Sequence, residues 1–181
     1  MNDILKQNRR FVQEMKQRNK DYFLNLSKGQ SPEIFLISCT DSRVSPSVIL
    51  QMPLGKLFVH RNVANQVNEN DDSFNASLYY ALKHLKVKKI VILGHTGCGG
   101  IQAAQHCNST DSFEVNSFGN WITHIQQSIK GHKNDSELLE KENVIQQMKK
   151  LKAHSIYEEY GNSVEIEGYL LHLETGELEL L

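Results

Sequence analysis

The sequence lacks the features that mark several large protein classes. It has three cysteines, three prolines and one tryptophan among 181 residues. Three cysteines are too few, and odd in number, for a disulfide scaffold, so we expect a reducing compartment in which thiols can bind metal. No apolar run approaches the roughly 20 residues that span a bilayer, and residues 1–23 lack the apolar core of a secretory signal. These absences predict a cytoplasmic protein without membrane partners.

An excess of charge of either sign is also missing. Lysine and arginine total 20 and aspartate and glutamate total 21, which gives a formal net charge of −1. Nucleic-acid-binding domains typically carry concentrated basic charge, so we expect no nucleic-acid partner. With 39% hydrophobic residues the chain can build one sizeable core. No repeat, low-complexity tract or long linker divides it, and we predict a single domain over residues 1–181.

Short apolar runs alternate along the chain with segments of helical periodicity. Strands buried on both faces are expected at 34–37, 57–59 and 90–93. Alternating polarity predicts half-exposed strands or a hairpin at 164–170 and 177–180. The expected helices cover 3–26 as one or two helices, 73–86, 100–106, 118–130 and 136–159, the last with a solvated face. This order predicts an α/β fold with a central, mostly parallel β-sheet flanked by helices.

Chemically reactive side chains follow two of the expected strands. Cys39 ends the first strand, and His95 and Cys98 follow the third within a glycine-rich turn. Ligands of open α/β sheets bind at the carboxyl ends of the strands, so we expect these three side chains to lie close together. Two thiolates and an imidazole suit zinc and leave a fourth position open. Taken alone, such a cysteine or histidine is more often structural than a ligand, and the turn could instead start a helix or hold an anion at its N-terminus.

Three separated motifs, CTDSR at 39–43, FVHRNVAN at 58–65 and GHTGCGG at 94–100, resemble the signature segments of β-class carbonic anhydrases. The resemblance runs from about residue 30 to residue 104 and keeps the family's motif order. It implies zinc-dependent, reversible hydration of carbon dioxide to bicarbonate and a proton by zinc-bound hydroxide. The implied ligands of the one Zn²⁺ per chain are Cys39, His95 and Cys98.

The same resemblance implies roles for residues around the metal. Asp41 and Arg43 match the family's catalytic dyad, in which the arginine keeps the aspartate ionised. If that pairing were lost, Asp41 could instead become the fourth zinc ligand and close the site, as in some members of the family. Gln30, Phe58 and Tyr80 match residues that line the substrate pocket of plant-like members.

The resemblance also implies a homo-oligomer, with a dimer as the minimal unit or a tetramer built from it. Residues 1–27 would form an N-terminal helical arm that packs on a partner subunit, and the active cleft would sit at the dimer interface. Thr40 and Lys56 depart from the family pattern, which favours serine or alanine and an acidic residue there. Two other functions stay open: hydrolysis of carbonyl sulfide or carbon disulfide, and zinc binding or bicarbonate sensing without turnover.

Several other polar residues are expected to be structural. We interpret Cys107 as a spare thiol and Arg61 as a residue that organises the backbone. Trp121 has helical spacing with apolar neighbours and is expected to pack in the core. Seven histidines have no partner at metal-binding spacing: His60, His84, His106, His124, His132, His154 and His172. One of them is a candidate proton shuttle for the zinc-bound water, and we expect most of them to face solvent.

Overall fold

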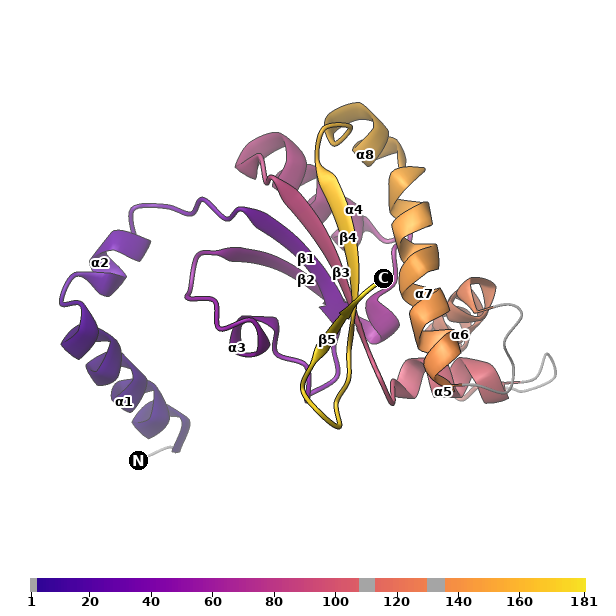
Figure 1. The fold of residues 1–181 in the computed structure, drawn as a ribbon, viewed down its shortest axis with the longest axis horizontal. Coiled ribbons are helices and arrows are strands. Elements are labelled where there is room, and N and C mark those ends of the chain that lie inside the picture. The colour runs from indigo at the N-terminus through magenta and orange to yellow at the C-terminus, as the bar shows by residue number, and fades with distance from the viewer. Residues whose placement is uncertain (1–2, 108–112, 130–135) are drawn as a thin grey trace. The chain divides into compact units, whose positions relative to one another are not determined.

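The computed structural model describes residues 3–107, 113–129 and 136–181 (Figure 1). The chain divides into two compact units, Met1–Ser31 and Pro32–Leu181. The first unit holds helices α1 (Asp3–Arg18) and α2 (Tyr22–Leu26), and neither buries a side chain. The rings of Phe11 and Phe23 join the two helices at a centroid distance of 6.0 Å. The predicted helices within residues 3–26 are therefore confirmed.

The second unit is built on a five-stranded sheet with the order β2-β1-β3-β4-β5. The strands are β1 (Ile34–Cys39), β2 (Leu57–Asn62), β3 (Lys89–His95), β4 (Glu165–Leu171) and β5 (Leu178–Leu180). The first four are parallel, and β5 runs antiparallel to β4. The predicted mostly parallel sheet and its C-terminal hairpin are confirmed.

The position of each strand in the sheet decides how deeply it is buried. Every residue of β1 and β3 after the first is buried, because helices or neighbouring strands cover them on all sides. Strand β2 lies at an edge of the sheet, and Val59 is 37% exposed. The expectation that β2 is buried on both faces was therefore wrong, since the side chains of an edge strand have a neighbouring strand on one side only.

Helices and short helical turns connect the strands. They are α3 (Pro46–Ile49), η1 (Val63–Asn65), α4 (Asp72–Tyr79), η2 (Tyr80–Leu85), α5 (Gly99–His106), α6 (Asn116–Ser128), α7 (Ser136–Lys152) and α8 (Ser155–Tyr160). Asp71 caps α4 by accepting from the backbone N–H groups of Ser73 and Phe74. Segment η2 continues α4 as a π-helix. The last residue of the predicted helix 118–130 lies outside the described residues.

The long charged segment 136–159 differs from its prediction in two ways. It forms two helices, because His154 leaves the helical conformation and its side chain caps α8 by accepting from Ile156 N–H. Helix α7 runs alongside β4 (Figure 1), and one stripe of it is buried. The buried residues of α7 are Leu139, Glu140, Asn143, Val144, Gln147 and Leu151. The expected solvated face covers only part of this helix.

Two apolar clusters matter for the position of the site. One packs α4, η2, α7 and α8 against a face of the sheet and includes Phe35, Phe74 and Val144. The other lies at the carboxyl ends of the strands, among α5, α6 and α7, and includes Cys39, Ala64, Cys98, Ile122 and Leu139. Reactive side chains at the strand ends are thus enclosed by apolar ones.

Most histidines were expected to face solvent, but two of them are buried. His60 is 8% exposed and lies against Ser77, and His154 is 1% exposed and contacts Asn75. Trp121 packs in the second cluster, as expected, and donates from Nε1 to the carbonyl oxygen of Val63. Among the helices of the described residues, none is both long and apolar enough to cross a membrane.

Candidate metal centre

The structure brings the three predicted metal ligands together. Cys39 ends β1, His95 ends β3, and Cys98 precedes the first turn of α5. All three side chains are buried, and their sulfur and nitrogen atoms lie within 4.8 Å of one another. The two sulfur atoms are 4.0 Å apart. Two thiolates on one tetrahedral zinc, at about 2.3 Å each, stand about 3.8 Å apart, so the pair matches that ion.

The two thiols share a proton in the absence of a metal. Contact with Cys98, and less strongly with His95 and the backbone N–H groups of Ala64 and Asp41, lowers the pKa of Cys39 to about 4 against the opposing effect of burial. The same contact and burial raise the pKa of the Cys98 thiol. A divalent cation between the sulfur atoms would take the place of that proton.

His95 presents one nitrogen to the same place. Its Nδ1 lies 2.9 Å from the carbonyl oxygen of Thr96, which can only accept, so Nδ1 carries the proton. Nε2 is buried and has no hydrogen-bond partner among the described residues. A buried nitrogen lone pair without a partner is unfavourable unless a ligand occupies it, so this atom fits a metal ion.

Asp41 and Arg43 form a closely bonded pair beside the cluster. Arg43 donates from Nε to Asp41 Oδ1 at 2.9 Å and from Nη2 to Oδ2 at 2.7 Å. These bonds hold the pKa of the Asp41 carboxyl well below its usual range. Arg43 Nη2 also donates to Gly97 O at 3.0 Å, which ties the β1 loop to the β3 turn. Asp41 Oδ2 lies 3.9 Å from His95 Nε2, so an ionised carboxylate faces the metal position.

Arg61 fixes the loop that carries these residues. Its guanidinium donates to the carbonyl oxygens of Cys39, Asp41 and Val44 at 3.0, 2.9 and 2.7 Å. One side chain on β2 thereby sets the path of the β1 loop over six residues. The expectation that Arg61 organises the backbone is confirmed.

Glu140 is a site residue that the sequence analysis missed. It lies on α7, is 3% exposed, and accepts the backbone N–H of Cys98 at 2.9 Å. Burial raises the pKa of its carboxyl. The signal was present in the sequence, since Glu140, Asn143, Val144 and Gln147 recur at helical spacing and so share one face. Only the covering of that face by the sheet shows that it is buried.

The predicted pocket residues Phe58 and Tyr80 lie away from the metal ligands of their own chain. Cys39 pairs with Asn62 across the sheet, and Phe58 precedes Asn62 by four residues, which corresponds to about 13 Å along the strand. The Tyr80 ring contacts the Phe58 ring at a centroid distance of 5.8 Å. Gln30 belongs to the first unit, Met1–Ser31.

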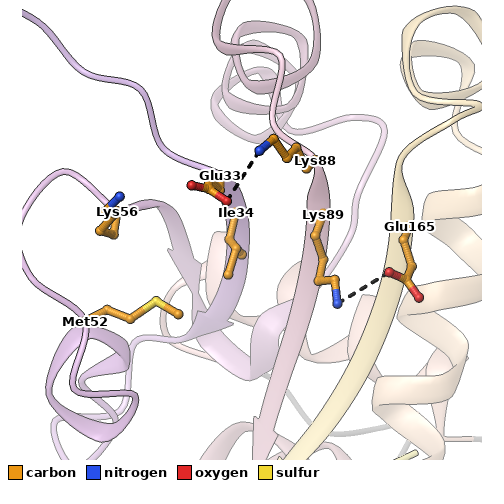
Figure 2. A pocket seen from close by; sticks show the side chains of 7 residues that line it. All are labelled: Glu33, Ile34, Met52, Lys56, Lys88, Lys89 and Glu165. Carbon is orange, nitrogen blue, oxygen red and sulfur yellow. Dashed lines mark ion pairs between the residues drawn. The ribbon is translucent and has the colours of Figure 1, made fainter.

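A cavity of about 540 Å³ opens at the opposite end of the sheet (Figure 2). Ile34, Lys89 and Glu165 in its wall begin strands β1, β3 and β4, whereas the metal ligands follow the strand ends. Its charged groups are paired in part, with Lys88 near Glu33 at 3.6 Å and Lys89 near Glu165 at 3.4 Å. This cavity therefore does not serve the metal centre of its own chain.

A second group of possible metal ligands, Glu137, His172 and Glu179, is more exposed. Lys141 Nζ lies 2.8 Å from the Glu137 carboxylate and 3.1 Å from that of Glu179. The lysine already balances the charge of these carboxylates, so this group does not resemble a metal site.

Comparisons with known proteins agree with the geometry. The family model described as carbonic anhydrase matches residues 34–178. A curated carbonic anhydrase of Emericella nidulans is 34% identical over 190 residues, covering 97% of this chain and 81% of the relative. A tetrameric β-carbonic anhydrase of Sordaria macrospora has a TM-score of 0.87 at 29% identity, over 98% of this chain and 94% of that one. A Coccomyxa β-carbonic anhydrase in complex with acetazolamide has a TM-score of 0.89 at 28% identity, over 98% and 84%.

Proposed function

Because this chain belongs to the β-class carbonic anhydrase family and is thereby a carbonic anhydrase, an enzyme of carbon dioxide hydration, we propose that it works with one zinc ion held by Cys39, His95 and Cys98. The observation that carries the proposal is the buried cluster of two thiols and an imidazole whose Nε2 has no partner among the described residues. When bound, zinc would supply the attacking hydroxide, because it strongly lowers the pKa of its water.

Asp41 and Arg43 would orient the proton of the attacking hydroxide. Arg43 keeps Asp41 ionised, so the carboxylate is only an acceptor and can orient a hydroxyl whose proton points at Oδ2. Both Asp41 oxygens are bonded to Arg43, which favours the open site over one in which Asp41 is the fourth ligand. Two thiolates leave zinc less acidic than three imidazoles do, so we expect the rate to rise between pH 7 and pH 9.

The substrate pocket is completed by a second copy of the chain. Phe58 lies about 13 Å from Cys39 along the sheet, farther than its ring can reach, so it cannot line the pocket of its own metal. We assign Gln30, Phe58 and Tyr80 to the site of the neighbouring subunit in a homodimer, or in a tetramer built from dimers. The amide of Gln30 would donate to the developing bicarbonate oxygen, and the two rings would give an apolar wall for carbon dioxide.

The N-terminal arm supports this assembly. Helices α1 and α2 bury no side chain, and Ile4, Leu5 and Leu24 are 74%, 52% and 60% exposed. Apolar side chains on one helix face gain stability by contact with another surface. We therefore expect the arm to pack on the partner subunit.

The decisive experiment compares two cysteines of the same chain. Stopped-flow hydration of carbon dioxide at pH 8.5 is measured together with zinc content for the wild type, Cys39→Ser and Cys107→Ser. We expect one zinc per chain and fast turnover for the wild type and Cys107→Ser, and loss of both in Cys39→Ser. Zinc binding without turnover of carbon dioxide would refute the proposal. Turnover of carbonyl sulfide or carbon disulfide would then identify a hydrolase, and absence of turnover of all three substrates would identify a zinc-binding or bicarbonate-sensing protein.

Subunit mixing tests the shared pocket. Cys39→Ser chains have no metal ligand set, and Phe58→Ala chains have a defective wall. If Phe58 serves the neighbouring site, a mixed dimer contains one site with both parts intact, and unfolding and refolding the two variants together restores activity. If Phe58 acts within its own chain, no mixed site is intact and activity stays at the level of the separate variants.

A further inference from the structure

The loop after β2 contains a backbone conformation that its residues disfavour. Ala64 has φ 63° and ψ 29°, and Asn65 follows with φ 48°. Ala64 carries a Cβ atom and no polar side chain, which makes the left-handed conformation unfavourable, whereas asparagine adopts it more readily. Both residues are buried, at 0% and 2% exposure. An alanine in this conformation persists only where its surroundings enforce it.

The conformation places a hydrogen-bond donor on a metal ligand. The backbone N–H of Ala64 donates to Cys39 Sγ at 3.4 Å. A donor on a thiolate stabilises the ionised, metal-binding form of the sulfur and fixes its orientation, which favours metal binding. It also draws charge from the sulfur and so tunes the acidity of the metal. Asp41 N–H donates to the same sulfur at 3.4 Å, but it lies in the loop that Arg61 holds. Ala64 lies in the loop after β2, so other residues must hold its backbone conformation.

That support comes from buried side-chain amides, which we call the amide cluster and define as Gln66, Asn143 and Gln147. The carbonyl oxygen of Ala64 accepts from Gln66 Nε2 at 2.7 Å and from Asn143 Nδ2 at 3.0 Å. Asn143 Oδ1 accepts from Gln66 Nε2 at 2.7 Å and from Gln147 Nε2 at 3.0 Å. Gln147 Oε1 accepts the backbone N–H of Val67 at 2.8 Å. The amide cluster thus binds the loop at the Ala64 carbonyl oxygen and at the Val67 N–H.

We propose that Asn143, with the amide cluster, is a positioning residue for the metal centre: it holds Ala64 in the left-handed conformation that keeps its N–H on the Cys39 sulfur. The proposal rests on the proposed function, because it requires a metal bound by Cys39. Asn143 reaches the metal only through Ala64, so its effect differs from that of a ligand. A purely structural role would change the stability of the protein and leave the metal's electronic environment as it is.

The test uses cobalt(II) in place of zinc, because thiolate-to-cobalt charge-transfer absorption reports the charge on the sulfur. Asn143→Leu keeps the size of the side chain and removes its N–H donor. Its matched control is Gln146→Leu on the same helix, since the amide of Gln146 donates to Glu142 one turn earlier on α7. We expect Asn143→Leu to shift the charge-transfer band and to weaken zinc binding about 10- to 100-fold in chelator competition. Gln146→Leu should do neither.

A second substitution separates positioning from general stability. Ala64→Gly removes the Cβ atom, so the left-handed conformation no longer needs to be enforced. In the Ala64→Gly background, Asn143→Leu should therefore cost less zinc affinity than it costs in the wild type. Equal losses in both backgrounds would refute the proposal, as would an unchanged band and zinc affinity in Asn143→Leu.

Two further outcomes are distinguishable. If Asn143→Leu does not fold, Gln66→Met removes the other donor to the Ala64 carbonyl, and the same shift and the same rescue by Ala64→Gly are expected. A wild-type protein that binds neither zinc nor cobalt would refute the proposed function, and the positioning role with it. Normal metal binding by the wild type, with unaffected variants, refutes the positioning role alone.

Discussion

Replacement of Glu140 with leucine removes the acceptor that holds the Cys98 N–H inside the protein. The bond is 2.9 Å long, and the glutamate is 3% exposed, so water cannot easily take its place. A buried donor left without an acceptor costs about 1–3 kcal/mol. If the metal-free turn relaxes and only the metal-bound form has to accept this cost, the zinc dissociation constant rises about 5- to 150-fold.

The measurement is a chelator competition at fixed pH, combined with thermal unfolding of the metal-free protein. Thermal unfolding of the metal-free protein measures the loss of stability that remains even when the turn can relax. Glu140→Gln keeps a carbonyl acceptor of the same shape, so its effect should be within about 1 kcal/mol. Glu137→Leu is the matched control, because Glu137 is exposed on the same helix and its pair with Lys141 is a surface pair worth about 0–1 kcal/mol.

The reasoning fails if Glu140→Leu binds zinc as tightly as the wild type and unfolds at the same temperature. It also fails if Glu140→Gln is as damaging as Glu140→Leu, because charge and not the acceptor would then decide the effect. A loss of zinc affinity in Glu137→Leu of similar size would show that any change on α7 disturbs the turn.

Three further predictions concern the pair beside the metal, the packing of α7 and the metal itself. Because Arg43 lowers the pKa of Asp41, the pair stabilises the fold above the unfolded aspartate pKa of about 3.9, and this stabilisation is lost as the pH falls through the pKa of the folded state. The difference in melting temperature between the wild type and Arg43→Met should therefore persist at pH 5–8 and shrink only in strong acid. A difference that grows on acidification would contradict this. In Gly94→Ala the new Cβ would stand 2.5 Å from Val144 Cγ2, so the Val144 side chain or the helix that carries it must shift, and unfolding should be easier by about 1–3 kcal/mol in urea titrations. In Gly99→Ala the new Cβ meets nothing within 4 Å, and the stability should stay within about 0.5 kcal/mol of the wild type. Removal of zinc by a chelator should lower the melting temperature, and zinc added back at 100 times its dissociation constant should restore about 2.7 kcal/mol; a melting temperature independent of zinc would argue against a bound ion.

The strands and the metal ligands were accessible from the sequence because their signals are local. The apolar runs at 34–37 and 90–93 can be satisfied only by burial on both faces, and they became the two central strands β1 and β3. Since parallel strands end at one edge of a sheet, the positions of Cys39, His95 and Cys98 followed directly. The burial of β2 did not follow, because the same apolar pattern fits an edge strand when another surface covers it.

The buried polar face of helix α7 could not be predicted from the local sequence. Its many charges predict a solvated face, and its polar residues at positions 140, 143 and 147 look ordinary in sequence. Their burial depends on the sheet and on the loop after β2, whose strained turn offers a carbonyl oxygen that the side chain of Asn143 satisfies. A buried polar side chain is recognised only when its partners are known, and these partners come from segments about 80 residues away.

The sequence by itself determined the family, the α/β fold and the three candidate metal ligands, because motifs, periodicity and the succession of strands and helices along the chain are properties of the chain read in one dimension. Only the tertiary structure decided that Glu140 holds the Cys98 turn, that Arg61 fixes the β1 loop, and that Phe58 lies too far from Cys39 to serve the same site. The physical reason is that such roles depend on distances and burial between segments that are remote in sequence. Those quantities exist only after the chain has packed.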